Sequence, residues 1–300
     1  MTDIPIIDAH QHFWDLSMNK HPWLCGKQMI PFRYGDYSSI RRTYLPDDYF
    51  VDSKAFNIVK TIHMEAEWDP KDPLGESEWL MQIHEKTGFP NAIIGQAWFL
   101  SEDIDEVLRA HAKCPLIRSV RQKPFAAASP GEFHPGLTGS MTDPAFRAGY
   151  ANLETYGLHF DLQTPWWHLR EAAELAHDFP ETTIILNHTG LPSDRSEAGL
   201  GGWMEGMKAL AAQPNTSVKI SGICVPGQKW TVEFNRKVVL DTIQVFGVER
   251  CMFSSNFPVD GVVASFDEIV NGFAGIVSVF SEADQLRLFH DNALKYYQPV

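Results

Sequence analysis

Short apolar segments alternate along the chain with longer amphipathic segments. The apolar segments are rich in Ile, Val and Phe, and several are apolar almost without interruption, as is typical of strands buried on both faces. Eight of them predict strands, namely Ile4–Ala9, Asn57–Glu65, Ala92–Phe99, Leu116–Gln122, Leu158–Gln163, Thr183–Asn187, Ser217–Ser221 and Arg250–Ser254. Strands separated by segments of helix length favour a parallel sheet built from βαβ units.

The segments between these strands carry helix signals. Asp143 and Pro144 precede a predicted helix over Ala145–Tyr156, with Pro at the first helical position and Gly157 just past the end. The other predicted helices are Glu76–Thr87, Ile104–Ala112, His168–Asp178, Gly202–Ala212, Val232–Phe246, Ser265–Ile276 and Glu282–Tyr297. No internal repeat and no linker rich in Pro, Gly or Ser divides the chain, so we predict a single domain over residues 1–300.

Two α/β architectures use this alternation, a closed barrel and a doubly wound nucleotide-binding sheet. The second favours a glycine-rich phosphate turn after an early strand, and neither GxGxxG nor GxxxxGK[ST] occurs in the chain. We therefore predict an α/β fold of the (β/α)8 TIM-barrel type. A barrel of this kind places its active site at the carboxyl ends of the strands.

One predicted connection, from Phe13 to about Leu45, is unusually long. It has little periodicity and contains six aromatic residues: Phe13, Trp14, Trp23, Phe32, Tyr34 and Tyr37. A long loop directly after the first strand lies over the active-site end of a barrel, where such loops often act as lids. A packed surface loop that covers the rim or a subunit interface is an equally good interpretation.

Composition narrows the classes of partner. The formal net charge of −13, from 25 Lys and Arg against 38 Asp and Glu, argues against nonspecific binding to nucleic acid or to an anionic membrane. The start Met-Thr-Asp-Ile-Pro lacks a basic segment followed by an apolar one, and no apolar run approaches ~18 residues. We expect a cytoplasmic protein. The four cysteines are scattered, without CxxC spacing, so no disulfide framework or zinc finger is predicted.

Candidate chemistry begins at the end of the first strand, with Asp8, His10 and His12. Residues two apart in a strand point to one face, so we expect all three side chains to project together into the mouth of the barrel. A lone histidine is more often a satisfied core residue. Two imidazoles in this spacing after a buried strand favour a functional site, because together they can hold a metal or polarise a carbonyl oxygen.

The segment Ile-Ile-Asp-Ala-His-Gln-His-Phe-Trp resembles the first barrel strand of the amidohydrolase superfamily, which ends in HxH. Leu186-Asn-His-Thr-Gly190 resembles the strand 6 motif with its histidine, and Phe253-Ser-Ser-Asn-Phe-Pro258 resembles the strand 8 motif. The resemblance spans nearly the whole chain and is closest to the branch of sugar-acid lactonases and 2-pyrone-4,6-dicarboxylate hydrolase. It implies hydrolysis of a lactone ester. It also implies either one divalent metal ion, with zinc favoured, on His10, His12 and His188, or a mechanism without a metal.

The chain departs from the family pattern at Asn256, where the family normally has an Asp that acts as general base. An amide accepts no proton at neutral pH, although it can orient a water. Three replacements are open: Asp260 from the loop after strand 8, a metal-bound water, or a residue of strand 2. His63, Glu65 and Glu67 share one parity on that strand, so they can face the interior together, and surface-facing positions on the rim are the alternative interpretation.

Substrate-binding candidates lie at other strand ends. Arg121 and Lys123 have matching parity at the end of strand 4, and the fork of an Arg suits a carboxylate. A structural ion pair with a neighbouring strand is the alternative for Arg121. Gln163 and Trp98 add an amide and an aromatic lining. We expect a small-molecule substrate that is anionic or polyhydroxylated, and a homodimer is a further possibility.

Three functions follow from these residues. The first is a hydrolase in which water attacks the ring carbonyl of a cyclic ester, the lactone of a sugar acid or of an aromatic-breakdown intermediate. The second is a metal-dependent decarboxylase of an aromatic acid on the same fold, which usually wants carboxylates on strands 1 and 8. The third is a non-catalytic ligand-binding homologue, for which clustered imidazoles have no obvious use.

Overall fold

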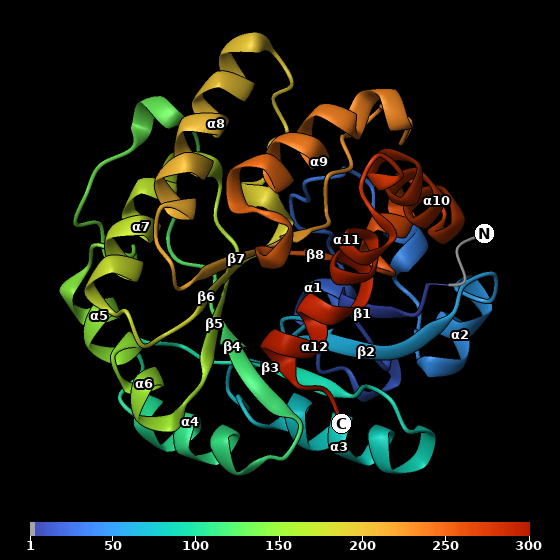
Figure 1. The fold of residues 1–300 in the computed structure, drawn as a ribbon. Helices are drawn as coiled ribbons and strands as arrows, with labels where there is room; N and C mark the ends of the chain where they lie inside the picture. The colour runs from blue at the N-terminus through green and yellow to red at the C-terminus, as the bar shows by residue number, and fades with distance from the viewer. Residues whose placement is uncertain (1–3) are drawn as a thin grey trace.

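The computed structural model describes residues 4–300 and shows a nearly closed barrel of parallel strands surrounded by helices (Figure 1). Neighbouring strands pair in chain order: β1 (Ile6–Gln11), β2 (Ile58–Met64), β3 (Ala92–Gln96), β4 (Ile117–Arg121), β5 (His159–Leu162), β6 (Ile184–Leu186), β7 (Thr216–Ile220) and β8 (Cys251–Phe253). Each predicted strand overlaps an observed one, and the predicted TIM barrel is confirmed. Residues 1–3 lie outside the described residues. They belong to the Met-Thr-Asp-Ile-Pro start, which was one of the reasons to expect a cytoplasmic protein.

Helices cover the outside of the barrel (Figure 1). They are α1 (Pro22–Cys25), α2 (Pro46–Asp52), α3 (Gly75–Thr87), α4 (Ile104–Lys113), α5 (Pro144–Tyr150), α6 (Asn152–Tyr156), α7 (Leu169–Asp178), α8 (Glu197–Ala211), α9 (Val232–Phe246), α10 (Phe266–Val277), α11 (Glu282–Leu286) and α12 (Asn292–Tyr297). The helix predicted over Ala145–Tyr156 is divided into α5 and α6, and a π-helical turn at Arg287–Asp291 divides the last predicted helix. Helices α1 and α2 were not predicted.

Two buried clusters define the inside and the outside of the barrel wall. The inner cluster contains side chains of alternate strand residues, closed at one end by the last helix: Ile7, Ala9, Ile62, Met64, Ala92, Ile94, Ile185, Met252, Ala293 and Tyr297. The intervening residues, among them Phe160, Leu186 and Val218, belong to the larger cluster between the strands and the helices. Because the strands are covered on both faces, they read in sequence as nearly continuous apolar runs.

The barrel closes between β8 and β1 through the segments that follow or end these strands. The Asn256 amide donates to the His10 carbonyl at 2.8 Å, and the His12 amide donates to the Phe257 carbonyl at 2.8 Å. The Asp8 carboxylate accepts hydrogen bonds from the Ser255 amide at 2.9 Å and from the Tyr49 hydroxyl of α2 at 2.8 Å. Closure therefore joins the two segments that carry the HxH and strand 8 motifs.

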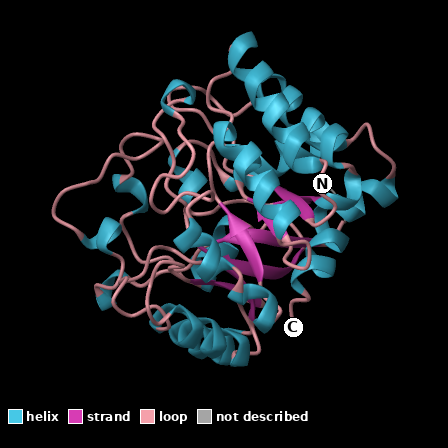
Figure 2. Cartoon of the chain, turned by 90° about the vertical axis from the view of Figure 1, so that its left-hand side faces the viewer, coloured by secondary structure: helices cyan, strands magenta, loops and turns pink. Residues whose placement is uncertain are grey.

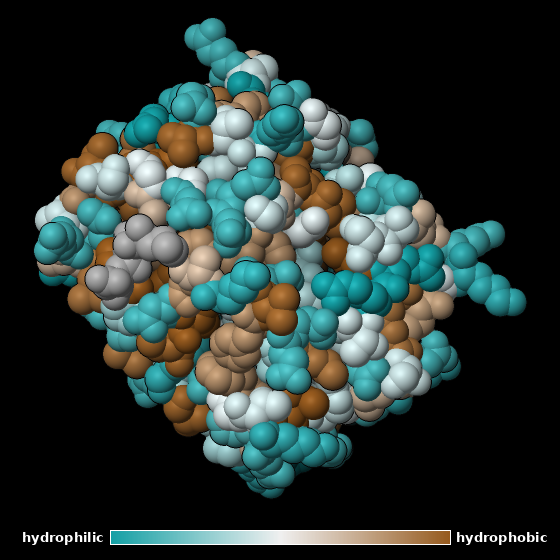
Figure 3. Space-filling model, turned by 90° about the vertical axis from the view of Figure 1, so that its right-hand side faces the viewer, coloured by the Kyte–Doolittle hydropathy of each residue, from teal (hydrophilic) through white to brown (hydrophobic). Residues whose placement is uncertain are grey.

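Long connections gather at one end of the barrel, away from the marked chain ends (Figure 2). Polar and apolar side chains are interspersed on the face that Figure 3 shows. Among residues 4–300, no helix combines the length and the apolar character needed to cross a bilayer. The candidate site residues lie at this same end, which is formed by the carboxyl ends of the strands.

Candidate active site

A cavity of about 210 Å³ opens at the carboxyl ends of the strands, and we call it the main cavity. Its walls come from six different elements of the chain. They include His12, Glu67, Arg121, Lys123, Gln163, His188 and Asn256 from strand ends, and Trp23, Ile30, Pro31, Phe32 and Arg33 from the connection after β1. The structure thus brings six of the eleven predicted site residues to one cavity.

The end of β1 differs from the expected alternation. Ile7 and Ala9 belong to the inner cluster, whereas the Asp8 carboxylate lies outside the wall against Tyr49. The pairing of β1 with β2 shifts register between Asp8 and Gln11. This irregularity places the His10 ring next to the rings of His12 and His188. The expectation that Asp8 shares their direction is wrong, because strict two-residue alternation fails at a register shift.

A left-handed backbone turn sets the direction of His188. In β6, Ile185 faces inward and Leu186 outward, so Asn187 faces inward and His188 would face the helices if the strand continued. His188 instead has φ +55°, and Thr189 has φ +52°. The turn returns the imidazole to the barrel mouth, where its centroid lies 4.6 Å from that of His10.

Strained backbone is concentrated at the main cavity. Seven non-glycine residues of the described chain have positive φ, and three of them, Glu67, His188 and Asn256, line this cavity. Such a conformation costs on the order of 1–3 kcal/mol per residue, and it persists where the surrounding structure imposes it. The three positions each follow a strand, and in each the turn fixes where a polar side chain points.

The three histidines are buried and electrically neutral near pH 7. Burial is the first cause that lowers the pKa of His10, His12 and His188 well below 6.5, and nearby cations and imidazoles lower each pKa further. The His10 and His12 ring centroids are 5.0 Å apart. A cluster of neutral imidazoles offers nitrogen lone pairs to a cation or hydrogen bonds to a carbonyl oxygen.

Several contacts bear on whether these rings can hold zinc. Both ring nitrogens of His10 are buried without a hydrogen-bond partner among the described residues. The His12 Nδ1–H donates to the Met64 carbonyl at 2.8 Å, the kind of contact that frees Nε2 of a metal-binding histidine. That Nε2 faces the Asn256 Oδ1 at 3.3 Å, and a cation would relieve the repulsion between the two lone pairs.

In donor type, then, three neutral imidazoles suit one zinc ion. Within residues 4–300, however, no group of three or more His, Cys, Asp or Glu side chains is arranged so that it could hold a metal ion. The donor set also lacks the usual carboxylate, since Asn256 occupies its position. The fit therefore rests on the unpaired nitrogens of His10 and on the orientation of His12.

Asp260 lies behind Asn256 and does not line the main cavity. Its carboxylate accepts hydrogen bonds from the Asn256 side-chain amide at 2.5 Å, the Tyr34 hydroxyl at 2.8 Å and the Gly222 backbone amide at 3.1 Å. Burial raises the pKa of Asp260, and the Arg33 charge together with the Asn256 and Tyr34 hydrogen bonds partly offsets that effect. The structure therefore places Asp260 where it orients Asn256, and it does not extend into the cavity as one interpretation of the sequence required.

Arg121 combines the two alternatives that the sequence left open. Its Nε donates to the Glu65 carboxylate at 2.5 Å, its Nη2 to the Glu65 carbonyl at 2.6 Å, and its Nη1 to the Gln163 Oε1 at 3.1 Å. A guanidinium has five N–H groups, so two remain for a ligand in the main cavity, which Arg121 lines. Lys123 is ion-paired with Glu67 at the same cavity.

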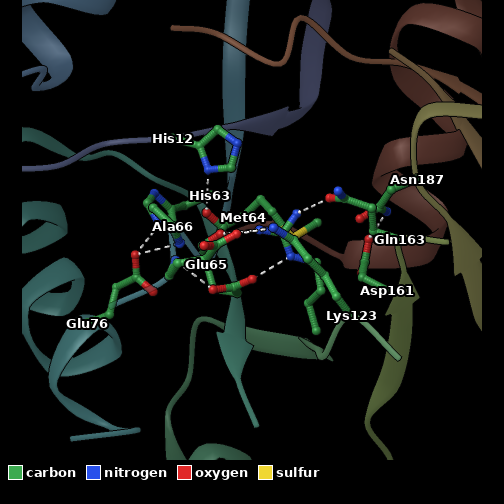
Figure 4. Close-up of polar contacts among 12 residues, drawn as sticks. His12, His63, Met64, Glu65, Ala66, Glu76, Lys123, Asp161, Gln163 and Asn187 are labelled. Atoms are coloured by element: carbon green, nitrogen blue, oxygen red, sulfur yellow. Dashed lines mark hydrogen bonds and ion pairs between the residues drawn. The ribbon is translucent and has the colours of Figure 1, made fainter. Parts of the chain in front are cut away.

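His63 faces away from the main cavity, contrary to the expected shared parity with Glu65 and Glu67. Its Nδ1 accepts from the Phe13 amide at 3.1 Å, and its Nε2 lies 3.2 Å from a Glu76 oxygen of α3 (Figure 4). Met64 takes the inward position instead. Because β2 alternates, His63 lies on the outer face, and the expectation that it faces the interior is wrong.

Trp98 lies outside the main cavity, in an adjoining hollow of about 440 Å³ at the barrel mouth. This hollow shares Arg121, Lys123 and Glu67 with the main cavity, and Glu65 also lines it. Trp98 and Glu65 are therefore near the predicted binding residues without lining the main cavity. Of the predicted site residues, His10, His63, Glu65, Trp98 and Asp260 are absent from its wall.

Below the imidazoles the barrel interior holds a buried ion pair. The Lys219 Nζ lies 2.8 Å from the Asp161 carboxylate, which also accepts from the Asn187 amide at 2.8 Å and the Tyr297 hydroxyl at 2.9 Å. Asn187 thus faces the barrel interior, because the left-handed turn begins at the next residue, His188. Burial lowers the pKa of Lys219 to about 8.

The long connection after β1 covers the main cavity. Its aromatic residues pack on one another, with Trp23 and Phe32 stacked at 5.8 Å between centroids. This packing presents Arg33 to the cavity beside His188. Sequence reasoning missed Arg33, because a single basic residue in an aperiodic segment gives no signal of its direction.

The chain matches the sequence profile of the amidohydrolase family over residues 7–298. The uncharacterized protein y4mH of Sinorhizobium fredii is 41% identical over 298 residues, covering 99% of this chain and 100% of that protein. An L-fucono-1,5-lactonase of Burkholderia ambifaria is 25% identical over 275 residues, covering 87% of this chain and 83% of that enzyme. The crystal structure of an amidohydrolase from Burkholderia multivorans with bound zinc superposes with a TM-score of 0.80 at 22% identity, covering 98% and 99% of the two chains. With its barrel and its strand-end histidines, the chain belongs to the amidohydrolase family.

Proposed function

We propose that the chain is a lactonase, which hydrolyses the cyclic ester of a sugar acid or of an aromatic-breakdown intermediate. The observation that carries the proposal is the main cavity, where His12, His188 and Arg121 line one space of about 210 Å³ at the strand ends. The family and its relatives indicate a hydrolase, and the similarity to L-fucono-1,5-lactonases supports the narrower class. In this reaction, water attacks the ring carbonyl carbon and the ring oxygen leaves as a hydroxyl group.

The imidazoles are placed to act on the ester carbonyl. His10, His12 and His188 would hold one zinc ion, which when bound polarises a carbonyl and lowers the pKa of water. Because the imidazoles are neutral near pH 7, their lone pairs are free for this role. The Asn256 amide lies beside His12, where it would orient the attacking water, and Asp260 holds this amide in position.

The opposite wall is suited to an anionic or polyhydroxylated ligand. Arg121 is held rigidly by Glu65 and Gln163, and its two free N–H groups suit a carboxylate or ring oxygen. Lys123 adds a second cation at the mouth. A rigid donor contributes to catalysis without the entropic cost of ordering a flexible side chain.

The experiment is an assay of acid release from a panel of sugar-acid and aromatic-derived lactones, with and without a chelator. We expect turnover of at least one lactone by the wild type. His188→Gln should lower kcat by about 10²-fold or more, the range for loss of a positioned catalytic group. His177→Gln, an exposed substitution on α7, is the matched control and should retain the wild-type rate.

Asp260→Asn separates the two roles considered for this carboxylate. If Asp260 only positions Asn256, kcat falls by no more than about tenfold and the pH–rate profile keeps its shape; a general base would cost about 10²–10⁴-fold. Carbon dioxide release from aromatic acids without lactone turnover would identify a decarboxylase instead. Ligand binding without any turnover would identify a non-catalytic homologue.

A homodimer and a cytoplasmic location stay predictions from the sequence.

A further inference from the structure

A second cavity adjoins the main cavity at the barrel mouth, and we call it the side cavity. It has a volume of about 150 Å³ and is lined by Arg33, Tyr34, Ser193, Arg195, Gly222 and Cys224, among others. Arg33 lines both cavities, so they meet at its guanidinium. None of the chemistry assigned to the imidazoles uses this second space.

Arg195 has more donors than partners. Its Nη2 donates to the Ile223 carbonyl at 2.9 Å and to the Asn235 Oδ1 at 3.3 Å. Its Nε and Nη1 are buried and have no hydrogen-bond partner among residues 4–300. The guanidinium stacks over the Phe234 ring at 5.1 Å, which fixes its plane.

Arg33, which also lines the side cavity, shows the same deficit. Its Nη1 is buried without a partner in the described chain, and its Nη2 lies 3.8 Å from Asp260, beyond hydrogen-bond distance. Asp260 already accepts hydrogen bonds from Tyr34, Asn256 and Gly222. The one nearby carboxylate is therefore committed to other donors.

Asp260 offsets part of the Arg33 charge, whereas the groups around Arg195 in the side cavity supply no counter-charge. Burial raises the pKa of both the Cys224 thiol and the Tyr34 hydroxyl, so both are neutral. The Asp194 carboxylate, next to Arg195 in sequence, accepts from the Ser196 amide at 2.9 Å and forms no ion pair with Arg195 in the described residues. Buried charged donors without acceptors are costly, so these two guanidinium groups favour an anionic acceptor in the side cavity.

We infer that Arg33 and Arg195 form a carboxylate-binding site in the side cavity, which takes one carboxylate of an organic acid. A guanidinium N–H donates a charge-assisted hydrogen bond to a carboxylate oxygen. The Arg195 Nε and Nη1 and the Arg33 Nη1 are free donors, so each of the two guanidinium groups can bind one oxygen of the carboxylate. The inference goes beyond the proposed lactonase activity, because binding at this site needs no ring opening.

The test is isothermal titration calorimetry at pH 7.5 with succinate and with succinamide, its uncharged counterpart. We expect the wild type to bind succinate and to bind succinamide at least tenfold more weakly. Arg195→Gln should weaken succinate binding about ten- to a hundredfold, as loss of a charged hydrogen bond does. Arg250→Gln is the matched control, since Arg250 also donates to backbone carbonyls and stacks on a Phe ring but does not line the side cavity.

A second variant keeps the inference testable if Arg195→Gln does not fold. Ser193 is exposed at the side cavity, so Ser193→Trp obstructs the cavity without disturbing a buried contact and should also weaken succinate binding. No measurable succinate binding by the wild type, equal binding of succinamide, or wild-type affinity in both variants would overturn the inference. Equal weakening in Arg250→Gln would overturn it too. Calorimetry detects binding without turnover, so failure of the lactonase assay is a separate result.

Discussion

At the scale of single residues, backbone turns determine which side chains meet in the main cavity. His188 and Asn256 both have positive φ, and both belong to motifs that follow a strand. In an extended continuation of the strand, His188 would point to the helices. The strain at these residues is maintained by the surrounding barrel, which is typical of positions that serve a site.

The proposed zinc site depends most directly on His10. Its two ring nitrogens are buried and unpaired, so His10→Gln should lower zinc affinity by about 100-fold or more, since even the loss of an outer partner costs 10–100-fold. Zinc bound per chain, measured by elemental analysis after equilibration with buffered zinc, is the readout. The exposed substitution His177→Gln should leave the zinc content unchanged. Equal zinc content in wild type and His10→Gln would contradict the assignment.

At the scale of elements, close packing against the barrel limits which helix positions accept a side chain. Gly149 in α5 lies so close to the Phe99 carbonyl that an added Cβ would be 2.0 Å from its oxygen. Gly201 in α8 is exposed, and an added Cβ there meets nothing within 4 Å. Packing therefore requires glycine at position 149 but not at position 201.

Substituting the two helical glycines by alanine should change stability in opposite directions. Gly149→Ala should lower the free energy of unfolding by about 1–3 kcal/mol, because the backbone of Phe99 must shift. Gly201→Ala should raise it by about 0.5–1 kcal/mol, since alanine is the better helix former. Urea unfolding measures both. A neutral Gly149→Ala would show that α5 lies farther from Phe99 than the structure indicates.

At the scale of the whole molecule, a charged layer lies inside an otherwise apolar barrel. The Lys219–Asp161 pair is buried between the imidazoles and the Tyr297 end of the interior. Burial lowers the pKa of Lys219 from 10.5 to about 8. Above about pH 8 the folded chain loses this proton, while the unfolded chain keeps it up to about pH 10.5, so this group makes stability rise with pH in that window.

The pH dependence of stability tests this interior pair. Between pH 8 and 9.5, Lys219 should contribute a rise of about 1–2 kcal/mol in the free energy of unfolding, and Lys219→Met should lack that rise. Denaturant titrations at several pH values give both curves. Lys208→Met, which removes an exposed lysine from α8, should keep the wild-type pH dependence. A rise that persists in Lys219→Met would have to come from another group.

Much of the fold was predictable because strands buried on both faces leave an unambiguous pattern. All eight strands were located, and α9 was predicted with its observed bounds, Val232–Phe246. The π-helical turn at Arg287–Asp291 and the short helices in the first connection were not predicted, because they depend on contacts with the barrel and not on local periodicity.

The sequence by itself determined the alternation of strands and helices, the barrel class, and the presence of histidines at the ends of β1 and β6. Only the tertiary structure decided which of those residues share a cavity. A register shift in β1 makes the side chains of Asp8 and His10 point in different directions, and a left-handed turn directs His188 to the barrel mouth. Alternation in β2 places His63 on the outer face of the barrel, away from the cavity. The physical reason is that periodicity specifies the faces of regular elements, whereas the side chains of this site lie where regular structure ends and long-range packing sets the backbone.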